Sequence, residues 1–319
     1  MTQQHPIHTG FTAATTADEA VAGIDLTGKN VIVTGGHAGL GLETTRALRK
    51  AGASVWIAAR DPARAARAIE GVPIEALDLV DPVSIDAFVK RWQRPLHILV
   101  NNAAIPTPRV RTLDARGYEL AFSTSHLGHF QLTLGLHEAL RAAGGARVVN
   151  VSSGAQRFGR IHWDDLQLAR GYDPRVAYAQ SKKANVLFAV ELDRRWSGDG
   201  IRGYAVHPGV VVGTTLNDSV GKEAQRAMGL IDEEDRPIID PATGKKTAPQ
   251  GASTIVFAAT SPKLAGIGGV YLRDCEVSPI DDEDRPLTAT SVPTDVVSSS
   301  IDPVAARRLW ELSAQLVAR

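Results

Sequence analysis

Short apolar segments alternate with longer stretches of helical periodicity along most of the chain, and this alternation constrains the fold more than any other sequence feature. It predicts strands near residues 31–34, 54–58, 74–77, 97–100, 147–151, 203–206 and 268–272. It predicts helices near 39–51, 82–92, 113–123, 126–142 and 174–197. Strands that alternate with helices form βαβ units with right-handed crossovers. We therefore expect an α/β fold with a single doubly wound parallel sheet, helices on both faces and a site beyond the carboxyl ends of the strands.

Two parts of the chain depart from this alternation. Residues 1–24 are polar and rich in Thr and Ala, so we expect a loosely packed arm before a single domain at 25–319. Residues 213–250 gain charge, Gly and Pro, which predicts a mobile lid over the substrate. The segments IDEEDRP at 231–237 and IDDEDRP at 280–286 are nearly identical, and we expect both to be solvated acidic loops.

The composition excludes several classes of protein. Lys and Arg number 35 and Asp and Glu also number 35, so the net charge of zero argues against a nucleic-acid binder, which needs a basic face. The only cysteine, Cys275, excludes an intrachain disulfide and is expected to be a buried packing residue. No apolar run reaches the ~18–20 residues of a membrane span, and the N-terminus lacks the pattern of a signal peptide. These features predict a cytoplasmic protein without a membrane partner.

A glycine-rich turn, TGGHAGLG at residues 34–41, joins the first predicted strand to the first predicted helix. Glycines allow the backbone to turn sharply and to approach a pyrophosphate without Cβ atoms in the way. The helix that follows offers free N–H groups and a partial positive charge to an anion. Gly35, Gly39 and Gly41 therefore indicate a dinucleotide site on a Rossmann-type sheet, although a tight packing turn would use the same residues.

The residues after the second strand bear on the choice of nucleotide. A site that prefers NAD normally has an acidic residue there, on the ribose hydroxyls, but Ala59 takes that place and Arg60 follows. A guanidinium suits a 2′-phosphate through charge-assisted hydrogen bonds, and His37 could assist from the glycine turn. Asp61 is better explained as the N-cap of the next helix. An exposed arginine after a strand is common, but together with the missing acid it favours NADP(H) over NAD.

Tyr178 and Lys182 are four residues apart in a strongly helical stretch, so their side chains lie on one helix face. A tyrosine with a pKa near ~10 is a poor proton donor or acceptor at neutral pH. A neighbouring ammonium favours the phenolate and makes the tyrosine usable as a general acid–base group for a carbonyl/alcohol couple. An exposed pair of no function would show the same spacing. The position of the pair, after a strand that ends at Ser152 and Ser153, favours the catalytic interpretation.

Taken in order, these segments resemble the short-chain dehydrogenase/reductase family from about residue 24 to 275. The motifs are TGGHAGLG at 34–41, Asp78 after the third strand, NNAA at 101–104, VSS at 151–153, YAQSK at 178–182 and HPG at 207–209. Three further segments are most similar to the retinol-dehydrogenase-like group: HLGHF at 126–130, RIHWDDL at 160–166 and GVYLRDCEV at 269–277. Ser153 and Tyr178 are 178 − 153 = 25 positions apart, an extended connection that also occurs in this group.

The resemblance implies roles for individual residues. Ser153 would orient the substrate oxygen, Tyr178 would transfer the proton, and Lys182 would also hold the nicotinamide ribose. Asp78 is expected at the adenine, Asn102 at the ribose and the fourth strand, and Pro208 and Gly209 at the nicotinamide. The complete set of cofactor contacts expected from the resemblance and the residues is Gly35, His37, Gly39, Leu40, Gly41, Arg60, Asp78, Leu79, Asn102, Ala103, Tyr178, Lys182, Pro208, Gly209, Val211 and Thr214. No metal is expected.

The chain departs from the family pattern at three positions. Ser125 replaces an asparagine that helps to hold a proton-relay water. The serine hydroxyl has a shorter reach but could hold the same water, so Ser125 is kept as a catalytic candidate. Ala104 ends the NNAA motif where glycine is usual, which narrows the adenosine groove. Gly213 stands where the family has a threonine, so the contact to the carboxamide is assigned to the next residue, Thr214.

Other residues admit a structural or a functional interpretation. His126 and His129 are three apart on a helix, but no Glu or Cys lies at ligand spacing, so we expect them to be structural. Phe158, His162 and Trp163 would either wall the substrate pocket or anchor their loop. The C-terminal segment 302–318, with Val304, Leu309, Leu312 and Leu316, predicts an amphipathic helix packed on its own subunit.

Together these features predict an NADP(H)-dependent oxidoreductase that transfers a hydride between the nicotinamide and a ketone, an aldehyde or a secondary alcohol. The resemblance also implies a homodimer or homotetramer. Two alternatives stay open. A regulatory protein would bind the nucleotide with little turnover, as Ser125 suggests, and a related reductase would act on a C=C or C=N bond.

Overall fold

A computed structural model describes residues 4–213, 221–286, 288 and 292–318 of the chain. Its centre is an eight-stranded sheet in the order β10-β9-β6-β5-β4-β1-β2-β3, in which only β10 runs antiparallel to its neighbour. The strands are β1 Asn30–Thr34, β2 Ser54–Ala59, β3 Ile74–Ala76, β4 Ile98–Asn101, β5 Ala146–Val151, β6 Ile201–His207, β9 Val270–Arg273 and β10 Glu276–Val277. A separate parallel pair consists of β7 Val210–Val211 and β8 Lys245–Lys246.

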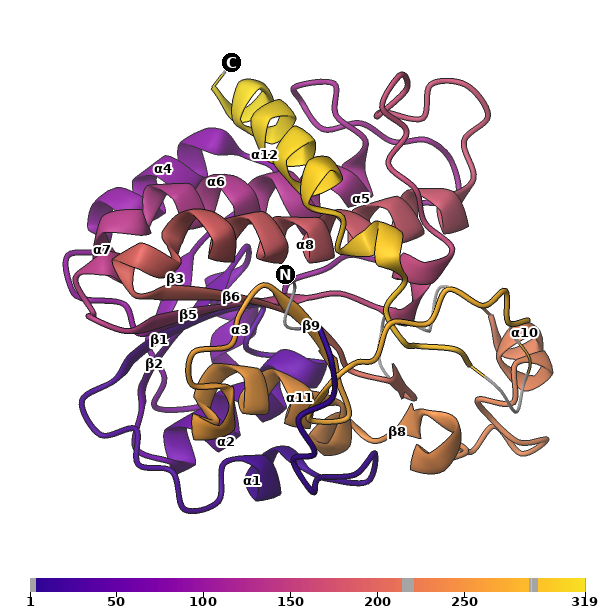
Figure 1. Ribbon diagram of the computed structural model, residues 1–319, viewed down its shortest axis with the longest axis horizontal. Coiled ribbons are helices and arrows are strands. Elements are labelled where there is room, and N and C mark those ends of the chain that lie inside the picture. The colour runs from indigo at the N-terminus through magenta and orange to yellow at the C-terminus, as the bar shows by residue number, and fades with distance from the viewer. Residues whose placement is uncertain (1–3, 214–220, 287, 289–291, 319) are drawn as a thin grey trace.

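Helices cover both faces of the sheet, as Figure 1 shows. They are α1 Ala17–Ala20, α2 Gly39–Lys50, α3 Pro62–Ala66, α4 Pro82–Arg91, α5 Leu120–Phe122, α6 Gly128–Gly135, α7 His137–Arg141, α8 Pro174–Trp196, α10 Lys222–Ala227, α11 Ala248–Thr260 and α12 Pro303–Val317. One face carries α1, α2 and α11, and the other carries α4, α6, α8 and α12. The expected doubly wound α/β sheet with helices on both faces is therefore confirmed.

The strand order reverses between β1 and β4, which are adjacent parallel strands at the centre of the sheet. Chain connections leave these two strands toward opposite sides of the sheet, so a crevice opens beyond their carboxyl ends. The segment after β1 is the glycine turn, and the segment after β4 begins with Asn102. The topology thus brings together two motifs that are more than sixty residues apart in the sequence.

The helix starts follow local side chains. Asp61 accepts a hydrogen bond from the backbone N–H of Arg64 at 2.9 Å and caps α3, with Pro62 at its first position. Asp173 caps α8 in the same way, through the N–H of Arg175 at 2.7 Å. These caps satisfy N–H groups that have no partner within the helix.

The prediction of a helix near 113–123 is wrong over most of that range, because only Leu120–Phe122 is α-helical, before a π-helical turn at Ser123–Leu127. Asp114 accepts hydrogen bonds from the N–H groups of Arg116 and Tyr118 at 2.8 and 3.0 Å. Such local bonds from an aspartate side chain compete with the helical ones. The chain therefore turns at Gly117, which has a φ of +86°.

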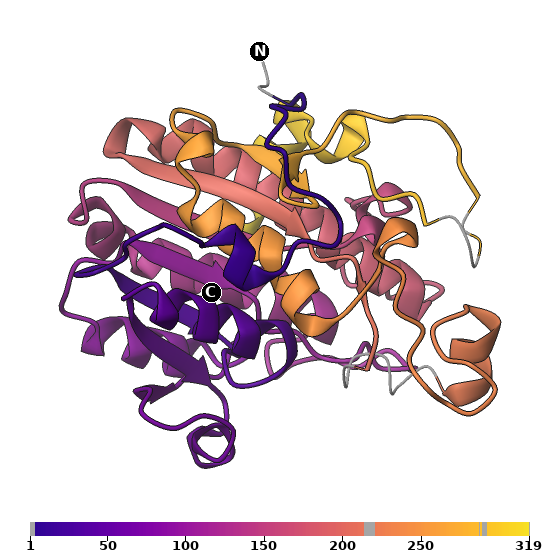
Figure 2. The ribbon, with the colours of Figure 1, turned by 90° about the horizontal axis from the view of Figure 1, so that it is seen from below.

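The N-terminal arm packs closely, contrary to the expectation of loose packing. Gln4 is buried and its side-chain amide donates to the carbonyls of Tyr271 and Ser278 at 2.9 and 2.6 Å. Phe11 packs edge-on against Phe257 of α11, with ring centroids 5.7 Å apart. Figure 2 shows the arm and α1, in indigo, lying beside α11, in orange. An apolar residue every few positions is enough to pack the arm against the domain, and the polar side chains of the arm hydrogen-bond to backbone carbonyls.

The segment 213–250, expected to be a lid, contains structure that the sequence did not predict. Its described part includes α10 and the strand β8, which pairs with β7 in register Val210↔Lys245. The two acidic segments within 231–237 and 280–286 both fold on themselves: Arg236 pairs with Asp232, and Arg285 pairs with Asp281. Helix α12 packs against α8 and α6, so the expected C-terminal amphipathic helix is confirmed, although Val304 is 74% exposed and does not take part.

None of the helices described here is long and apolar enough to cross a membrane.

Candidate active site

A cavity of about 1000 Å³ lies at the carboxyl edge of the sheet. Its floor comes from the ends of β1, β2, β4, β5 and β6 and from the turns that follow them. The same cavity runs from Arg60 at one end, past Gly35 and Asn102, to Ser153 and Tyr178. It is therefore large enough to hold a dinucleotide and a substrate together.

The glycine turn leaves no room for side chains where it faces the strand end. A Cβ at Gly41 would lie 2.4 Å from the carbonyl oxygen of Gly35 and 2.6 Å from Nδ2 of Asn102. Gly35 and Gly39 have φ angles of +64° and +50°, a left-handed conformation that favours glycine. Asn102 ties the turn to β4 by donating from Nδ2 to the carbonyl of Thr34 at 2.8 Å. This cradle fits the pyrophosphate of a dinucleotide at the start of α2.

The far end of the cavity carries positive charge. Arg60 follows β2, and Arg64 lies one turn further along on α3, so both exposed side chains line the same wall. Burial, followed by the charge of Arg64, lowers the pKa of His37, and His37 Nδ1 is buried without a hydrogen-bond partner among the described residues. Arg64 was not predicted from the sequence. Its position four residues after Arg60 could have indicated that both arginines line the same wall.

Tyr178 and Ser153 meet at the other end of the cavity. Burial raises the pKa of the Tyr178 phenol, and a hydrogen bond with the Ser153 side chain partly offsets that rise. Ser153 begins the short 3₁₀ turn Gly154–Arg157 directly after β5, and its hydroxyl accepts from the N–H of Ala155 at 3.2 Å. The two residues, 25 positions apart in sequence, thus form one polar pair on the cavity wall.

Lys182 lies behind Tyr178 on α8 and does not itself line the cavity. It is 4% exposed, and its Nζ donates to the carbonyl oxygen of Val151 at 3.2 Å. Asn185 Nδ2 donates to the same carbonyl at 3.1 Å. Burial lowers the pKa of Lys182 to about 8. The end of β5 therefore fixes the ammonium directly beneath the tyrosine.

A buried histidine connects the π-helical turn to the glycine turn. His129 is neutral, because burial lowers its pKa to about 4. Its Nδ1 faces the carbonyl oxygen of Ser125 at 3.1 Å, which can only accept, so Nδ1 carries the proton. Its Nε2 then accepts from the hydroxyl of Thr34 at 2.9 Å. The Thr34 oxygen also accepts from the N–H groups of Asn102 and Ala103, each at 2.9 Å, so every partner in this chain is satisfied.

Ser125 is buried within the π-helical turn, 5% exposed, and is not among the residues that line the cavity. Its neighbour Thr124 does line the cavity, and the Thr124 hydroxyl is buried without a hydrogen-bond partner in the described structure. The role expected for the Ser125 hydroxyl stays a prediction. Thr124 was not singled out from the sequence, because nothing in the motif distinguishes it.

Most of the residues predicted from the sequence line the one cavity. They are Gly35, His37, Gly39, Leu40, Arg60, Asp78, Leu79, Asn102, Ala103, Ser153, Tyr178, Pro208, Gly209 and Val211. Ala104 lines it as well. Gly41 and Lys182 stand immediately behind this lining, and Thr214 lies outside the described residues.

The HPG segment is joined to the serine turn. His207 Nδ1 accepts from the N–H of Gly154 at 3.0 Å, and burial lowers the pKa of His207 to about 3, so it is neutral. Gly209 has a φ of +82° and packs on the side chain of Lys246, because a Cβ there would lie 2.8 Å from Lys246 Cδ. The segment expected to contact the nicotinamide is therefore held from both sides.

Apolar side chains from three distant segments complete the lining of the cavity. Phe158 and Met228 are 55% and 45% exposed at its edge, and Val292 and Pro293 come from the chain before α12. The two interpretations of the 158–163 loop, a cavity wall or an anchor, apply to different residues. Phe158 walls the cavity, whereas Trp163 anchors the loop beneath the Arg308 guanidinium, 4.2 Å from its ring centroid.

The remaining candidates are structural. His126 is buried among aromatic rings and hydrogen-bonds Ser313 of α12 at 2.7 Å, and burial lowers its pKa to about 3. The described residues contain no group of His, Cys, Asp and Glu that could hold a metal ion. Cys275 is fully buried, and burial raises the pKa of its thiol to about 11, which makes it a packing residue.

Comparisons with known proteins agree with this geometry. The model of a family described as short chain dehydrogenase matches residues 29–225. A Streptomyces antibioticus protein named "Probable oxidoreductase" is 44% identical over 299 residues, 90% of this chain and 97% of the relative. Retinol dehydrogenase 12 of Homo sapiens is 36% identical over 307 residues, 92% and 88% of the two chains. The solved structure of an uncharacterised protein from Mycobacterium paratuberculosis superposes with a TM-score of 0.69 at 31% identity, over 94% and 97% of the two chains.

Proposed function

The chain belongs to the short-chain dehydrogenase family, within which it is similar to the retinol-dehydrogenase-like group, and from this premise we propose that it is an NADP(H)-dependent oxidoreductase of ketones, aldehydes or secondary alcohols. The observation that carries the proposal is the meeting of Ser153 and Tyr178 above the buried Lys182, at one end of a cavity whose other end is a dinucleotide cradle.

When bound, the nicotinamide supplies or takes the hydride. In the direction of reduction, the Tyr178 phenol donates its proton to the carbonyl oxygen while the Ser153 hydroxyl holds that oxygen by a hydrogen bond. The ammonium of Lys182 stabilises the phenolate that remains. In the direction of oxidation the phenolate takes the proton of the alcohol, so the same three residues serve both directions.

NADP(H) is favoured by the charges at the adenosine end. Arg60 and Arg64 line that wall, and neither guanidinium forms an ion pair with another described residue. A 2′-phosphate would accept charge-assisted hydrogen bonds from them, whereas the 2′-hydroxyl of NAD would leave both without a counter-charge. Asp61, a carboxylate that also lines the cavity, is engaged as the cap of α3. The apolar side chains of Phe158, Val292 and Pro293 in the cavity lining favour a hydrophobic carbonyl or alcohol as the substrate.

The proposal is tested by titrating the purified protein with NADPH and with NADH and following binding through cofactor fluorescence. Oxidation of each cofactor is then followed with a panel of aliphatic and aromatic aldehydes and ketones. We expect tighter binding of NADPH and turnover with hydrophobic carbonyls. Binding of neither nucleotide would contradict the proposal, and tight binding without turnover on any substrate would favour a nucleotide-binding regulatory protein.

Two further proposals have separate grounds: the location rests on the sequence pattern, and the assembly rests on the family resemblance. We propose that the protein is cytoplasmic and that it forms a homodimer or a homotetramer. Light scattering of the purified protein distinguishes these two assemblies from a monomer, and a monomeric mass would contradict the second proposal.

A further inference from the structure

A lysine is buried beneath the turn that closes the cofactor side of the cavity. Lys246 of β8 is fully buried, and its alkyl chain supports Gly209 from below. Its Nζ lies 2.5 Å from Oδ1 of Asp274. Lysines are rarely buried in full unless they are paired. The backbone of β8 also holds the turn, because the N–H of Val212 donates to the Lys246 carbonyl at 3.1 Å.

Asp274 divides its carboxylate between two cations. Oδ1 faces Lys246, and Oδ2 accepts from Arg273 Nη1 at 2.7 Å. Asp274 and Cys275 form the tight turn between β9 and β10 with φ angles of +52° and +58°, a left-handed conformation that non-glycine residues rarely adopt. The turn is fixed in place because Thr254 accepts from the N–H of Cys275 at 3.1 Å and Thr9 donates to its carbonyl at 2.9 Å. Asp274 is therefore held on a rigid support.

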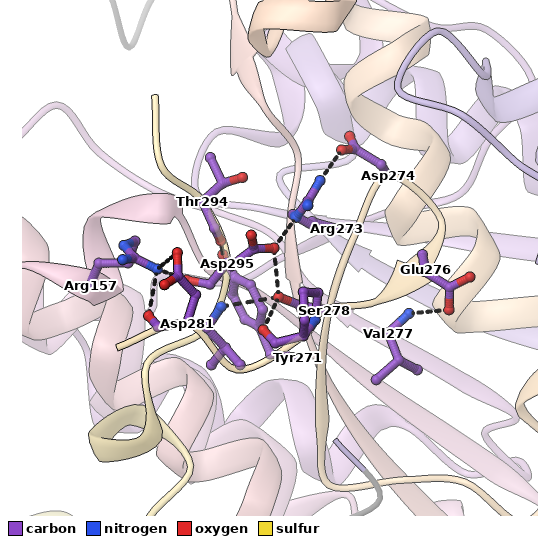
Figure 3. A network of polar contacts seen from close by, with 12 residues as sticks. Arg157, Tyr271, Arg273, Asp274, Glu276, Val277, Ser278, Asp281, Thr294 and Asp295 are labelled. Atoms are coloured by element: carbon purple, nitrogen blue, oxygen red, sulfur yellow. Dashed lines mark hydrogen bonds and ion pairs between the residues drawn. The ribbon is translucent and has the colours of Figure 1, made fainter. Parts of the chain in front are cut away.

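On the other side of Arg273 the chain of charges reaches the wall of the substrate cavity. Arg273 Nε pairs with the carboxylate of Asp295, as Figure 3 shows. Asp295 closely follows Val292 and Pro293, which line the cavity. The carbonyl of Asp295 accepts from Arg157 Nη1 at 2.9 Å, which ties this wall to the 3₁₀ turn that Ser153 begins.

We propose that Asp274 is a positioning residue that holds both sides of the active-site cavity through the chain Lys246–Asp274–Arg273–Asp295. Lys246 places Gly209 and β7 at the cofactor side, and Arg273 places residues 292–296 at the substrate side. The functional part of this inference rests on the proposed function, since it assigns the two sides to cofactor and substrate. The mechanical part, that one carboxylate holds both segments, rests on the contacts alone.

Hydrogen–deuterium exchange of the full chain without ligand tests the mechanical part. Asp274→Asn should speed exchange by about tenfold both at residues 210–212 and at residues 294–297. Asp295→Asn should affect only the second segment. A matched control is Asp18→Asn, because Asp18 pairs with Lys50 at the same 2.5 Å but on the exposed surface of α1 and α2. If Asp274→Asn loosens one segment and leaves the other as in the wild type, the proposal is wrong.

A second readout separates positioning from a purely structural role. In Asp274→Asn we expect the Kd of NADPH and the KM of the carbonyl substrate to rise together by about 5–20-fold, with kcat within about threefold. A lower Tm with unchanged Kd and KM would overturn the functional part. If the protein binds no nicotinamide cofactor, the proposed function fails while the exchange result still decides the mechanical part.

The single substitution leaves Lys246 buried without its carboxylate, which is strongly destabilising. If that variant does not fold, Lys246→Met combined with Asp274→Asn removes both charges and is measured in the same way. The double variant should show the same paired loosening of the two segments. Wild-type exchange at both segments in a folded double variant would overturn the proposal.

Discussion

The ammonium nitrogen of Lys182 lies 5.6 Å from the centre of the Tyr178 ring, one turn further along α8. The position is fixed at both ends, because Nζ donates to the Val151 carbonyl and Ser152 Oγ donates to the Lys182 carbonyl at 2.7 Å. A positive charge held at this distance stabilises the phenolate and so opposes the rise in the Tyr178 pKa that burial causes. In the proposed function, this arrangement makes the pair of Tyr178 and Lys182 the site of proton transfer.

The first prediction concerns pH. Burial lowers the pKa of Lys182 to about 8, so the ammonium is present below this pH and is lost as the pH rises through it. A neutral amine cannot stabilise the phenolate, so kcat/KM for carbonyl reduction should be level near neutrality and fall as the pH rises through about 8. Steady-state kinetics in NADPH from pH 6 to about 10 measure this.

A matched control for the pH profile is the next residue in the chain. Burial also lowers the pKa of Lys183 to about 8, but its Nζ donates to Ser299 Oγ at 2.7 Å, whereas the Nζ of Lys182 donates to the end of β5. Lys183→Met should keep the wild-type profile, whereas Lys182→Met should lower kcat by about 100-fold or more. The assignment to Lys182 would be wrong if the decline disappeared in Lys183→Met instead.

The second prediction concerns the adenosine end. Replacing Arg60 or Arg64 with alanine should weaken NADPH binding by about tenfold each, the lower part of the range for a lost charged hydrogen bond, because both side chains are exposed. NADH binding should change by less than about twofold, since it has no 2′-phosphate to lose. Arg67→Ala is the control, because Arg67 lies on the same helix end but does not line the cavity. Equal losses for NADPH and NADH would show that these arginines do not read the 2′-phosphate.

The third prediction concerns the cradle. Gly41→Ala places a Cβ 2.4 Å from the Gly35 carbonyl, so the turn or Asn102 must move. We expect a loss of about 1–3 kcal/mol in stability and at least a tenfold loss in NADPH affinity. Gly198→Ala is the control, because a Cβ there meets nothing within 4 Å. Thermal melting and NADPH titration measure both effects, and wild-type affinity in Gly41→Ala would argue against the cradle.

Much of this architecture could be predicted from the sequence because its signals are local. The strands of the sheet are continuous apolar segments, and Asp61 and Asp173 cap the helices that follow them. The glycine turn and the pair of Tyr178 and Lys182 depend on spacing within a few residues. Such local features do not depend on how the rest of the chain is arranged. For this reason the residues predicted to bind the cofactor do line one cavity.

The features that escaped prediction depend on contacts between distant segments. The close packing of the arm depends on Gln4 meeting β9, more than 260 residues later. Val292 and Pro293 reach the cavity because distant side chains, among them Arg157, Arg273 and Tyr271, hold the segment that follows. No local pattern announces either contact. The missing helix near 113–123 has a different cause, since the Asp114 side chain competes for backbone N–H groups.

The most direct test of the central claim is NADPH oxidation by the wild type and by Tyr178→Phe with the same hydrophobic carbonyl. We expect Tyr178→Phe to bind NADPH within about fivefold of the wild type, since only one cofactor contact is lost, but to lose about 10²–10⁴-fold in kcat, because the proton donor is gone. Tyr172→Phe, which loses only a hydroxyl that donates to the Pro108 carbonyl, should stay within about twofold of the wild type. Undiminished turnover in Tyr178→Phe would contradict the account.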